Sequence, residues 1–224
     1  MVRCKYKFVR KETSFSNQGE RFLHEIVAQR DIHEEQAKGI VGWFYGSYIK
    51  ETIKFVKKTG GLILDAGCGD GIMFKNEDIK PIQLDISATR LKRAKKYNDL
   101  LICGDAYSLP FKDGAFDLVL VVAVLEHTAE PRRILVEAHR VLKLNGFLIV
   151  LIPNDLNMTI GRLLLFKWPP RYPDHLTFIT PKRLYQWTKE YFSISVSYPL
   201  PFRKISFWFN MYYFAIMNKI IHHK

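Results

Sequence analysis

The sequence predicts a doubly wound α/β domain, in which parallel strands alternate with helices. Residues 62–71 read LILDAGCGDG, an apolar run that ends in an acidic residue and then in three glycines at alternate positions. Apolar residues bounded by glycine are typical of a buried parallel strand. The next apolar run, residues 82–85, ends in Asp85, twenty positions after Asp65. A glycine-rich first turn with a carboxylate about 20 residues later is how such domains hold an adenosine-type ribose.

The spacing of the glycines excludes two other nucleotide sites. A dinucleotide fingerprint places its third glycine three residues after the second, where this chain has Ile72. A phosphate-binding P-loop ends in Gly-Lys-Ser/Thr, and no such triplet follows. Glycine has no Cβ, so this turn can bend sharply and lie close to a ligand.

Residues 67–71 (GCGDG) resemble motif I of the class I S-adenosylmethionine (SAM)-dependent methyltransferases, and the later stretches also match in order. These are residues 101–106 (LICGDA), 109–119 (LPFKDGAFDLV), 124–127 (VLEH) and 141–150 (VLKLNGFLIV). Residues 41–47 (VGWFYGS) and 174–181 (DHLTFITP) resemble further segments of such enzymes. The resemblance implies a Rossmann-like methyltransferase fold. Its mostly parallel seven-stranded sheet has the order 3-2-1-4-5-7-6, with helices on both faces.

The same resemblance implies SAM as cofactor, S-adenosyl-L-homocysteine as product, and a set of binding residues. In the family the glycines lie at the methionine end of the cofactor and an acidic residue at the position of Asp85 holds the ribose. Asp105 and Ala106 match the positions that meet adenine, and Val122 lies where the backbone meets the amino-acid end. Asp65 is expected to order the glycine turn. The complete expected set is Asp65, Gly67, Cys68, Gly69, Asp70, Gly71, Asp85, Ile86, Asp105, Ala106 and Val122.

His127 and His175 are the candidate catalytic residues. Both are expected near the mouth of the pocket, and the ordinary histidine pKa of about 6.5 suits proton transfer near neutrality. Each also has a plainer interpretation. His127 could fix the loop after the fourth strand by hydrogen bonding, and His175 could only contact the substrate. Glu126 is expected to be structural.

The chain divides into residues 1–58, an N-terminal helical cover, and residues 59–224, the SAM-binding core. Within the core, residues 154–180 are too long for an ordinary connection, and long loops in compact domains are often functional lids. This segment follows the fifth strand, so we expect it over the carboxyl ends of the strands, where ligands bind. Thr180 and Pro181 predict the start of a helix, as N-cap and first helical residue.

Composition limits the setting of the protein. Three cysteines suggest no disulfide framework, and no zinc-like spacing of cysteine or histidine occurs, so we expect no metal site and a reducing, cytoplasmic setting. The N-terminus lacks the apolar region of a secretory signal. The net charge of +12 includes basic clusters at residues 3–11 and 90–96. A solvated surface explains such charge, but attraction to nucleic acid or to an anionic membrane is also open.

The aromatic C-terminal segment, residues 203–221, has two interpretations. Residues 205–217 read ISFWFNMYYFAIM, have basic flanks, and are followed by no acidic residue. The run is too short to cross a bilayer, and its composition is that of a segment lying in a membrane interface. It could equally form the last strand and helix of the domain or a contact with another chain. The packed interpretation is favoured for its first half.

The apolar lid and tail favour a small hydrophobic or lipid-linked acceptor, such as an isoprenoid, a quinone precursor or a lipid-carried sugar. The protein would then be cytoplasmic or peripheral on the membrane. An RNA methyltransferase is the alternative that the charge supports, although the Asn/Asp-Pro-Pro-Tyr/Phe signature is absent after the fourth strand. A SAM-binding, non-catalytic partner subunit is the third possibility. The sequence does not indicate an oligomeric state.

Overall fold

The computed structural model describes residues 15–28 and 39–220. Parts of the predicted helical cover and the first basic cluster lie outside these residues. The strands of the described chain are β1 (Ile63–Ala66), β2 (Ile82–Asp85), β3 (Leu101–Cys103), β4 (Phe116–Val122), β5 (Leu142–Pro153), β6 (Phe192–Leu200) and β7 (Tyr212–Lys219). The helices are α1 (Phe15–Ala28), α3 (Gly39–Thr59), α4 (Ala88–Ala94), α5 (Pro131–Val141), α6 (Asp155–Leu164) and α7 (Pro181–Thr188). Short 3₁₀ turns are η1 (Ile72–Phe74), η2 (Leu125–His127) and η3 (Phe207–Phe209).

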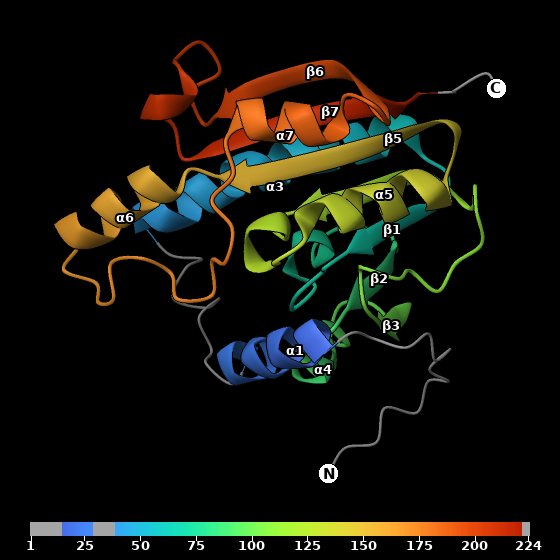
Figure 1. Cartoon of the computed structure of the whole chain (residues 1–224), viewed down its shortest axis with the longest axis horizontal. Helices are drawn as coiled ribbons and strands as arrows, with labels where there is room; N and C mark the ends of the chain where they lie inside the picture. The colour runs from blue at the N-terminus through green and yellow to red at the C-terminus, as the bar shows by residue number, and fades with distance from the viewer. Residues whose placement is uncertain (1–14, 29–38, 221–224) are drawn as a thin grey trace.

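The seven strands form one sheet in the order β3-β2-β1-β4-β5-β7-β6 (Figure 1). The first five strands pair in parallel, whereas β7 runs antiparallel to both β5 and β6. This is the strand order that the methyltransferase resemblance implies, and the prediction is confirmed. The carboxyl ends of the parallel strands all lie on the same side of the sheet, on the left of Figure 1.

Helices cover both faces of the sheet because its central strands are apolar on both sides. In β4, Val119 and Val121 face the core beneath α5 and α7. The alternate residues Leu118, Leu120 and Val122 face the second core, beneath α3. Successive side chains of a strand point to opposite faces, so a continuous apolar run fills both layers. Helix α3 falls in the range assigned to the helical cover, and it contributes Tyr48, Ile53 and Val56 to this second core.

The aromatic C-terminal segment is divided between core and surface. Its second half is β7, which lies between β5 and β6, with Tyr212 and Phe214 to Met217 buried. Its first half forms the turn at η3, where Trp208 and Phe209 are exposed. The first half is therefore only partly packed, through Phe207 and Asn210, whereas most of the second half is buried. The buried side chain of Asn210 holds the turn by donating to the carbonyls of residues 202, 205 and 206.

The predicted lid contains a helix, α6, and then an irregular segment that leads to α7. Asn154 caps α6 by accepting a hydrogen bond from the Asn157 amide, 3.3 Å away. Thr180 caps α7 in the same way, with Pro181 in its first turn, as the sequence predicts. Figure 1 shows α6 and the segment after it near the carboxyl end of β5. The lid segment thus starts beside the carboxyl ends of the parallel strands.

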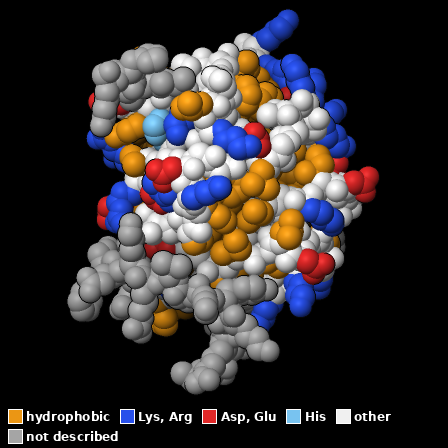
Figure 2. All heavy atoms as spheres, turned by 90° about the vertical axis from the view of Figure 1, so that its right-hand side faces the viewer, with side chains coloured by type: hydrophobic (Ala, Val, Ile, Leu, Met, Phe, Trp, Pro, Cys, Tyr) orange, Lys and Arg blue, Asp and Glu red, His pale blue; other side chains and the backbone are white. Residues whose placement is uncertain are grey.

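Charge is mixed over the face that Figure 2 shows, which is the right-hand side of Figure 1. Lysine and arginine side chains are scattered there, with acidic side chains between them, around a central apolar area. No described helix is both long enough and apolar enough to cross a membrane.

Candidate functional site

A cavity of about 460 Å³ opens at the carboxyl ends of the parallel strands. Its volume is within the range of about 300–1,000 Å³ that is typical of small-molecule sites. Both candidate histidines line it, together with ten of the expected cofactor residues: Asp65, Gly67, Cys68, Gly69, Asp70, Asp85, Ile86, Asp105, Ala106 and Val122. Gly71 is the exception. It lies beyond the cavity wall, against Ala94 of α4.

The glycine turn between β1 and η1 forms one wall of this cavity. Gly67 has a φ of +87°, and a Cβ there would lie 2.5 Å from a methyl carbon of Val124. Both the backbone angle and this close approach require glycine. Two hydrogen bonds fix the turn to the end of β2, because the amides of Gly67 and Cys68 both donate to the Leu84 carbonyl.

Asp85 fixes the glycine turn and also lines the cavity. Its Oδ2 accepts a 2.8 Å hydrogen bond from the Gly69 amide, and its Oδ1 accepts one of the same length from the Ser87 amide. Each carboxylate oxygen has two acceptor positions, so both oxygens can still accept a ribose hydroxyl. The sequence predicts the ribose role, but the contact with Gly69 only becomes visible in the folded chain.

Asp65 and Asp70 are engaged by the protein. Asp65 is 2% exposed and accepts a 3.1 Å hydrogen bond from Gln83. Burial raises the pKa of Asp65 to about 7, the Gln83 hydrogen bond opposes this rise, and the charge of Asp85 adds to it. Asp70 pairs with Arg93 of α4 at 3.3 Å. Gln83 belongs to β2, so this hydrogen bond does not reach the glycine turn, and the expected role of Asp65 in ordering the turn stays a prediction.

Asp105 follows β3 and closes the adjacent wall. Its Oδ1 accepts a 2.8 Å hydrogen bond from the amide of Tyr107, two residues later. This local turn brings Asp105 and Ala106 to the cavity, beside the wall that Asp85 and the glycine turn form. The two positions expected to meet adenine are therefore next to the position expected to meet ribose.

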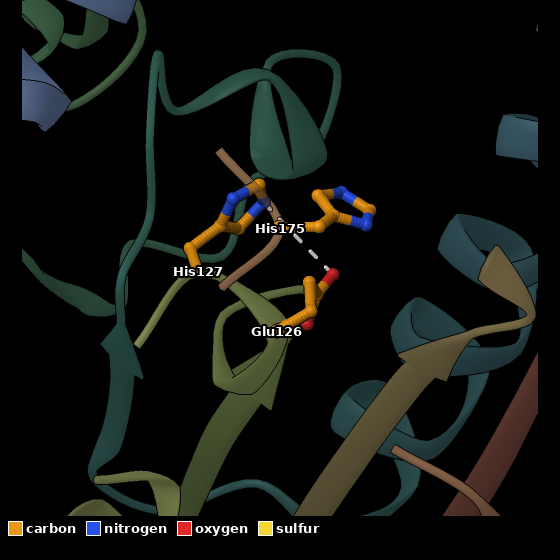
Figure 3. A group of neighbouring side chains, drawn as sticks. All are labelled: Glu126, His127 and His175. Atoms are coloured by element: carbon orange, nitrogen blue, oxygen red, sulfur yellow. Dashed lines mark ion pairs between the residues drawn. The ribbon is translucent and has the colours of Figure 1, made fainter. Parts of the chain in front are cut away.

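In the same cavity, the two candidate histidines meet in an edge-to-face contact with ring centroids 4.8 Å apart. His127 comes from η2 and His175 from the end of the lid segment (Figure 3). Backbone hydrogen bonds bring them together, since the amides of Leu176 and Thr177 both donate to the Glu126 carbonyl. The sequence places both near the pocket mouth without indicating that they touch.

Each histidine also has a carboxylate partner at its Nδ1. His127 Nδ1 lies 3.1 Å from Asp174 Oδ2, and His175 Nδ1 lies 2.5 Å from Asp155 Oδ1. Sequence reasoning did not select either aspartate. Asp174 precedes His175 in a motif that had been noticed, whereas nothing in the sequence links Asp155 to that histidine.

Glu126 completes this group. Its side chain is 1% exposed, and its Oε1 lies 4.0 Å from His127 Nε2 (Figure 3). Burial raises the pKa of Glu126, and the two histidines oppose that rise. Burial also disfavours the charged form of His127, but the hydrogen bond to Asp174 and the charge of Glu126 outweigh it, so the His127 pKa is raised. The carboxylates therefore favour positive charge at this end of the cavity.

Aromatic and apolar side chains make up much of the remaining wall. Tyr45 and Tyr48 of α3 form a cluster with Tyr212 of β7, with ring centroids 5.1 to 6.4 Å apart. Met158 of α6 and Tyr172 of the lid segment line the same space. Residues 41–47 resemble an aromatic segment of the family, whereas the sequence left open whether Tyr212 packs in the domain or lies at a membrane surface.

The chain is an α/β protein with a cavity that is lined both by the glycine turn and Asp85 and by aromatic side chains. Residues 64–150 match the family model described as a methyltransferase domain. Demethylmenaquinone methyltransferase of Thermotoga maritima is 30% identical over 155 residues, which cover 57% of this chain and 68% of that protein. The chain belongs to the SAM-dependent methyltransferases, and SAM is the cofactor of that family.

Two further comparisons concern an uncharacterized relative and the fold. An uncharacterized protein of Methanocaldococcus jannaschii is 45% identical over 102 residues, covering 45% of this chain. The match spans 44% of that relative, less than half of its length. The crystal structure of a SAM-dependent methyltransferase from Thermotoga maritima superposes with a TM-score of 0.64 at 23% identity. It covers 89% of this chain and 97% of that one, and it supports the fold.

Proposed function

We propose that this protein transfers the methyl group of SAM to a small hydrophobic acceptor, such as an isoprenoid, a quinone precursor or a lipid-carried sugar. The observation that carries the proposal is the shared cavity, which is lined both by the glycine turn and Asp85 and by the tyrosine cluster. The demethylmenaquinone methyltransferase among the relatives supports an acceptor of this kind. Apolar and aromatic walls suit a ligand that has little hydrogen-bonding capacity of its own.

The residues present fit SAM. A side chain at Gly67 would fill the space where the turn passes Val124, and Asp85 offers carboxylate oxygens to a ribose. Gly67 and Gly69 would face the methionine end and Val122 its amino-acid group, with Asp105 and Ala106 at the adenine. Cys68, Asp70 and Ile86 would line the same pocket, while Asp65 would order the turn. Bound there, SAM supplies a methyl carbon that is activated by a positively charged sulfur.

The protein contributes positioning and exclusion of water to this reaction. Residues 154–180 would close over the acceptor, since α6 and Tyr172 already line the cavity. His127 and His175 lie where the acceptor's nucleophilic atom would meet the methyl group. If that atom carries a proton, these histidines and their aspartates are the groups that face it.

We also propose that the protein docks peripherally on an anionic membrane, from which it takes its acceptor. The docking surface consists of Leu163–Phe166, Trp168, Phe202, Ile205, Trp208 and Phe209, all exposed. Phe166 is 97% and Trp168 84% exposed. Asn157 of α6 donates to the carbonyls of Trp208 and Asn210, which joins the two parts of this surface. Exposed Lys167 and Lys204 lie within it, and such charges are attracted to anionic headgroups.

The acceptor proposal is tested by incubating the full chain with isotope-labelled SAM and a lipid extract, followed by mass spectrometry. We expect label in an apolar product, and label in RNA instead would favour the RNA methyltransferase. SAM binding without turnover on any extract, together with a partner that co-purifies, would favour the non-catalytic subunit.

A further inference from the structure

We propose that Glu126, His127 and His175 bind a divalent transition-metal ion, and that the ion is zinc. One ligand atom from each residue lies within 4.8 Å of the other two. Two histidines and a glutamate are a ligand set of catalytic zinc sites, which keep a further coordination position for a water or a substrate. The three residues come from two separate segments, so no local spacing in the sequence indicates such a site.

The buried carboxylate of Glu126 is the first argument. Its Oε2 has no hydrogen-bond partner among the described residues, although the side chain is almost fully buried. Its Oε1 lies 4.0 Å from His127 Nε2, which is longer than a hydrogen bond. A buried carboxylate oxygen without a partner is unfavourable when the group is charged, and a bound cation would compensate that charge. Figure 3 shows the Glu126 carboxylate beside the two imidazole rings.

The two aspartates are the second argument. Asp174 engages Nδ1 of His127, and Asp155 engages Nδ1 of His175. Metal-binding histidines almost always donate their second ring nitrogen to a carboxylate, a carbonyl or a water, which fixes the ring and leaves the other nitrogen for the metal. Here both rings have a carboxylate, supplied by different elements.

The distances suit an ion that draws its ligands together. Two donors on a tetrahedral zinc ion are about 3.3 Å apart, because each bond is about 2.0–2.1 Å long. The ligand atoms here lie within 4.8 Å of one another, and side-chain rotation would bring them to that separation. Imidazole ligands favour zinc and its neighbours, whereas magnesium and calcium prefer oxygen ligands.

The inferred ion has a role in transfer that rests on the proposed function. An acceptor hydroxyl that occupies the remaining coordination position loses its proton more readily. The oxygen then forms a bond to the methyl carbon, the carbon–sulfur bond breaks, and its electron pair stays on the sulfur as a thioether. The proton leaves to solvent. The substrate class is therefore an acceptor with a hydroxyl group, and the reaction is O-methylation.

Zinc titration by calorimetry tests the site on the full chain. Adjacent His222 and His223 lie outside the described residues and are ligands by type, so every protein carries H222A and H223A. We expect one zinc ion per chain and no competition from magnesium. Glu126→Gln and His175→Ala should each weaken zinc binding by more than about 100-fold. Asp155→Asn removes only a positioning residue and should weaken it by about 10–100-fold.

His139→Ala is the matched control, because this histidine lies on α5 and does not line the cavity. The His139→Ala variant should bind zinc with the same affinity as the parent protein. Each variant is also titrated with SAM, because SAM binding shows that the variant is folded and that its cofactor pocket is intact. Unchanged zinc affinity in both Glu126→Gln and His175→Ala would overturn the site, as would no zinc binding by a parent that binds SAM. Loss of SAM binding by the parent would instead contradict the proposed function.

Discussion

Two aspartates of this chain have opposite pKa shifts, which follow from where each side chain lies. Asp65 is enclosed behind the glycine turn, and burial raises its pKa to about 7. Asp117 lies near the surface at the start of β4, where hydrogen bonds from Lys143 and the Leu62 amide lower its pKa. Ionisation of Asp65, which lines the cavity, costs stability, whereas ionisation of Asp117 stabilises the fold.

Asp65 should make the protein less stable as pH rises. Its folded pKa is above the unfolded value of 3.8, so its proton is held in the folded state and released on unfolding between pH 4 and about 7. Asp65→Asn keeps an acceptor for Gln83 and cannot ionise. It should increase the free energy of unfolding at pH 8 by up to about 4 kcal/mol, with a gain that shrinks toward pH 4.

Urea unfolding at several pH values measures this difference. Asp117→Asn is the matched control with the opposite sign, because a lowered folded pKa stabilises the protein above the unfolded pKa. It should destabilise the protein at pH 7 and have less effect as pH falls below 4. A gain from Asp65→Asn that did not vary with pH would show that Asp65 is charged in the folded protein.

At the scale of elements, α6 and the segment after it contribute Met158 and Tyr172 to the wall of the cavity. The Lys167 amide donates to the Arg162 carbonyl, and the Arg162 side chain donates to the Pro169 carbonyl. The loop between them therefore leaves and returns at nearly the same place. In the sequence, Asp155 precedes this loop and His175 follows it.

Replacing residues 163–168 with two glycines should leave the cofactor pocket intact and remove part of the lid. We expect an unchanged SAM affinity and a loss of about 100-fold in transfer to the acceptor, because a poorly held acceptor is misplaced from the methyl group. Calorimetry and labelled-SAM assays measure the two properties. Full transfer by this variant would mean that the segment is not a lid for the reaction.

The elements also show why some of the fold was predictable and some was not. The strands β1, β2, β4 and β5 were visible because each apolar run ends at a glycine, an aspartate or a known motif. Strand β7 was left open because both of its faces are buried, so Tyr212 to Met217 show no alternation that separates the last strand of the domain from an interfacial segment. The histidine–aspartate pairs were missed because Asp155 and Asp174 approach their partners only through the tertiary path of the lid.

At the scale of the whole molecule, the exposed aromatic residues lie on the same side as the cavity. Strand β7 cannot be removed to test membrane docking, since it joins β5 to β6 and a chain ending at Pro201 would lose the middle of this half of the sheet. Substitution of the exposed side chains avoids this problem. Leu144, an exposed apolar residue near the start of β5, provides a comparison for the docking surface.

Phe166, Trp168, Trp208 and Phe209 should be replaced together with serine, and Leu144→Ser serves as the control. Wild type and control should pellet with anionic vesicles at low salt and dissociate as salt rises, because the basic residues are screened. The quadruple variant should remain in the supernatant with an unchanged melting temperature. Vesicle binding by a folded quadruple variant would contradict docking through this surface.

The central claim is that the cavity binds SAM through the glycine turn and the carboxylate of Asp85. Calorimetric titration of the full chain with SAM and with NAD tests it, with Asp85→Ala and the exposed-surface control Asp99→Ala beside the wild type. We predict tighter binding of SAM than of NAD, and a loss in Asp85→Ala of about 1.5–3 kcal/mol, the value of hydrogen bonds to a charged group. Asp99→Ala should match the wild type. Equal SAM affinity in wild type and Asp85→Ala, or tighter binding of NAD than of SAM, would contradict the account.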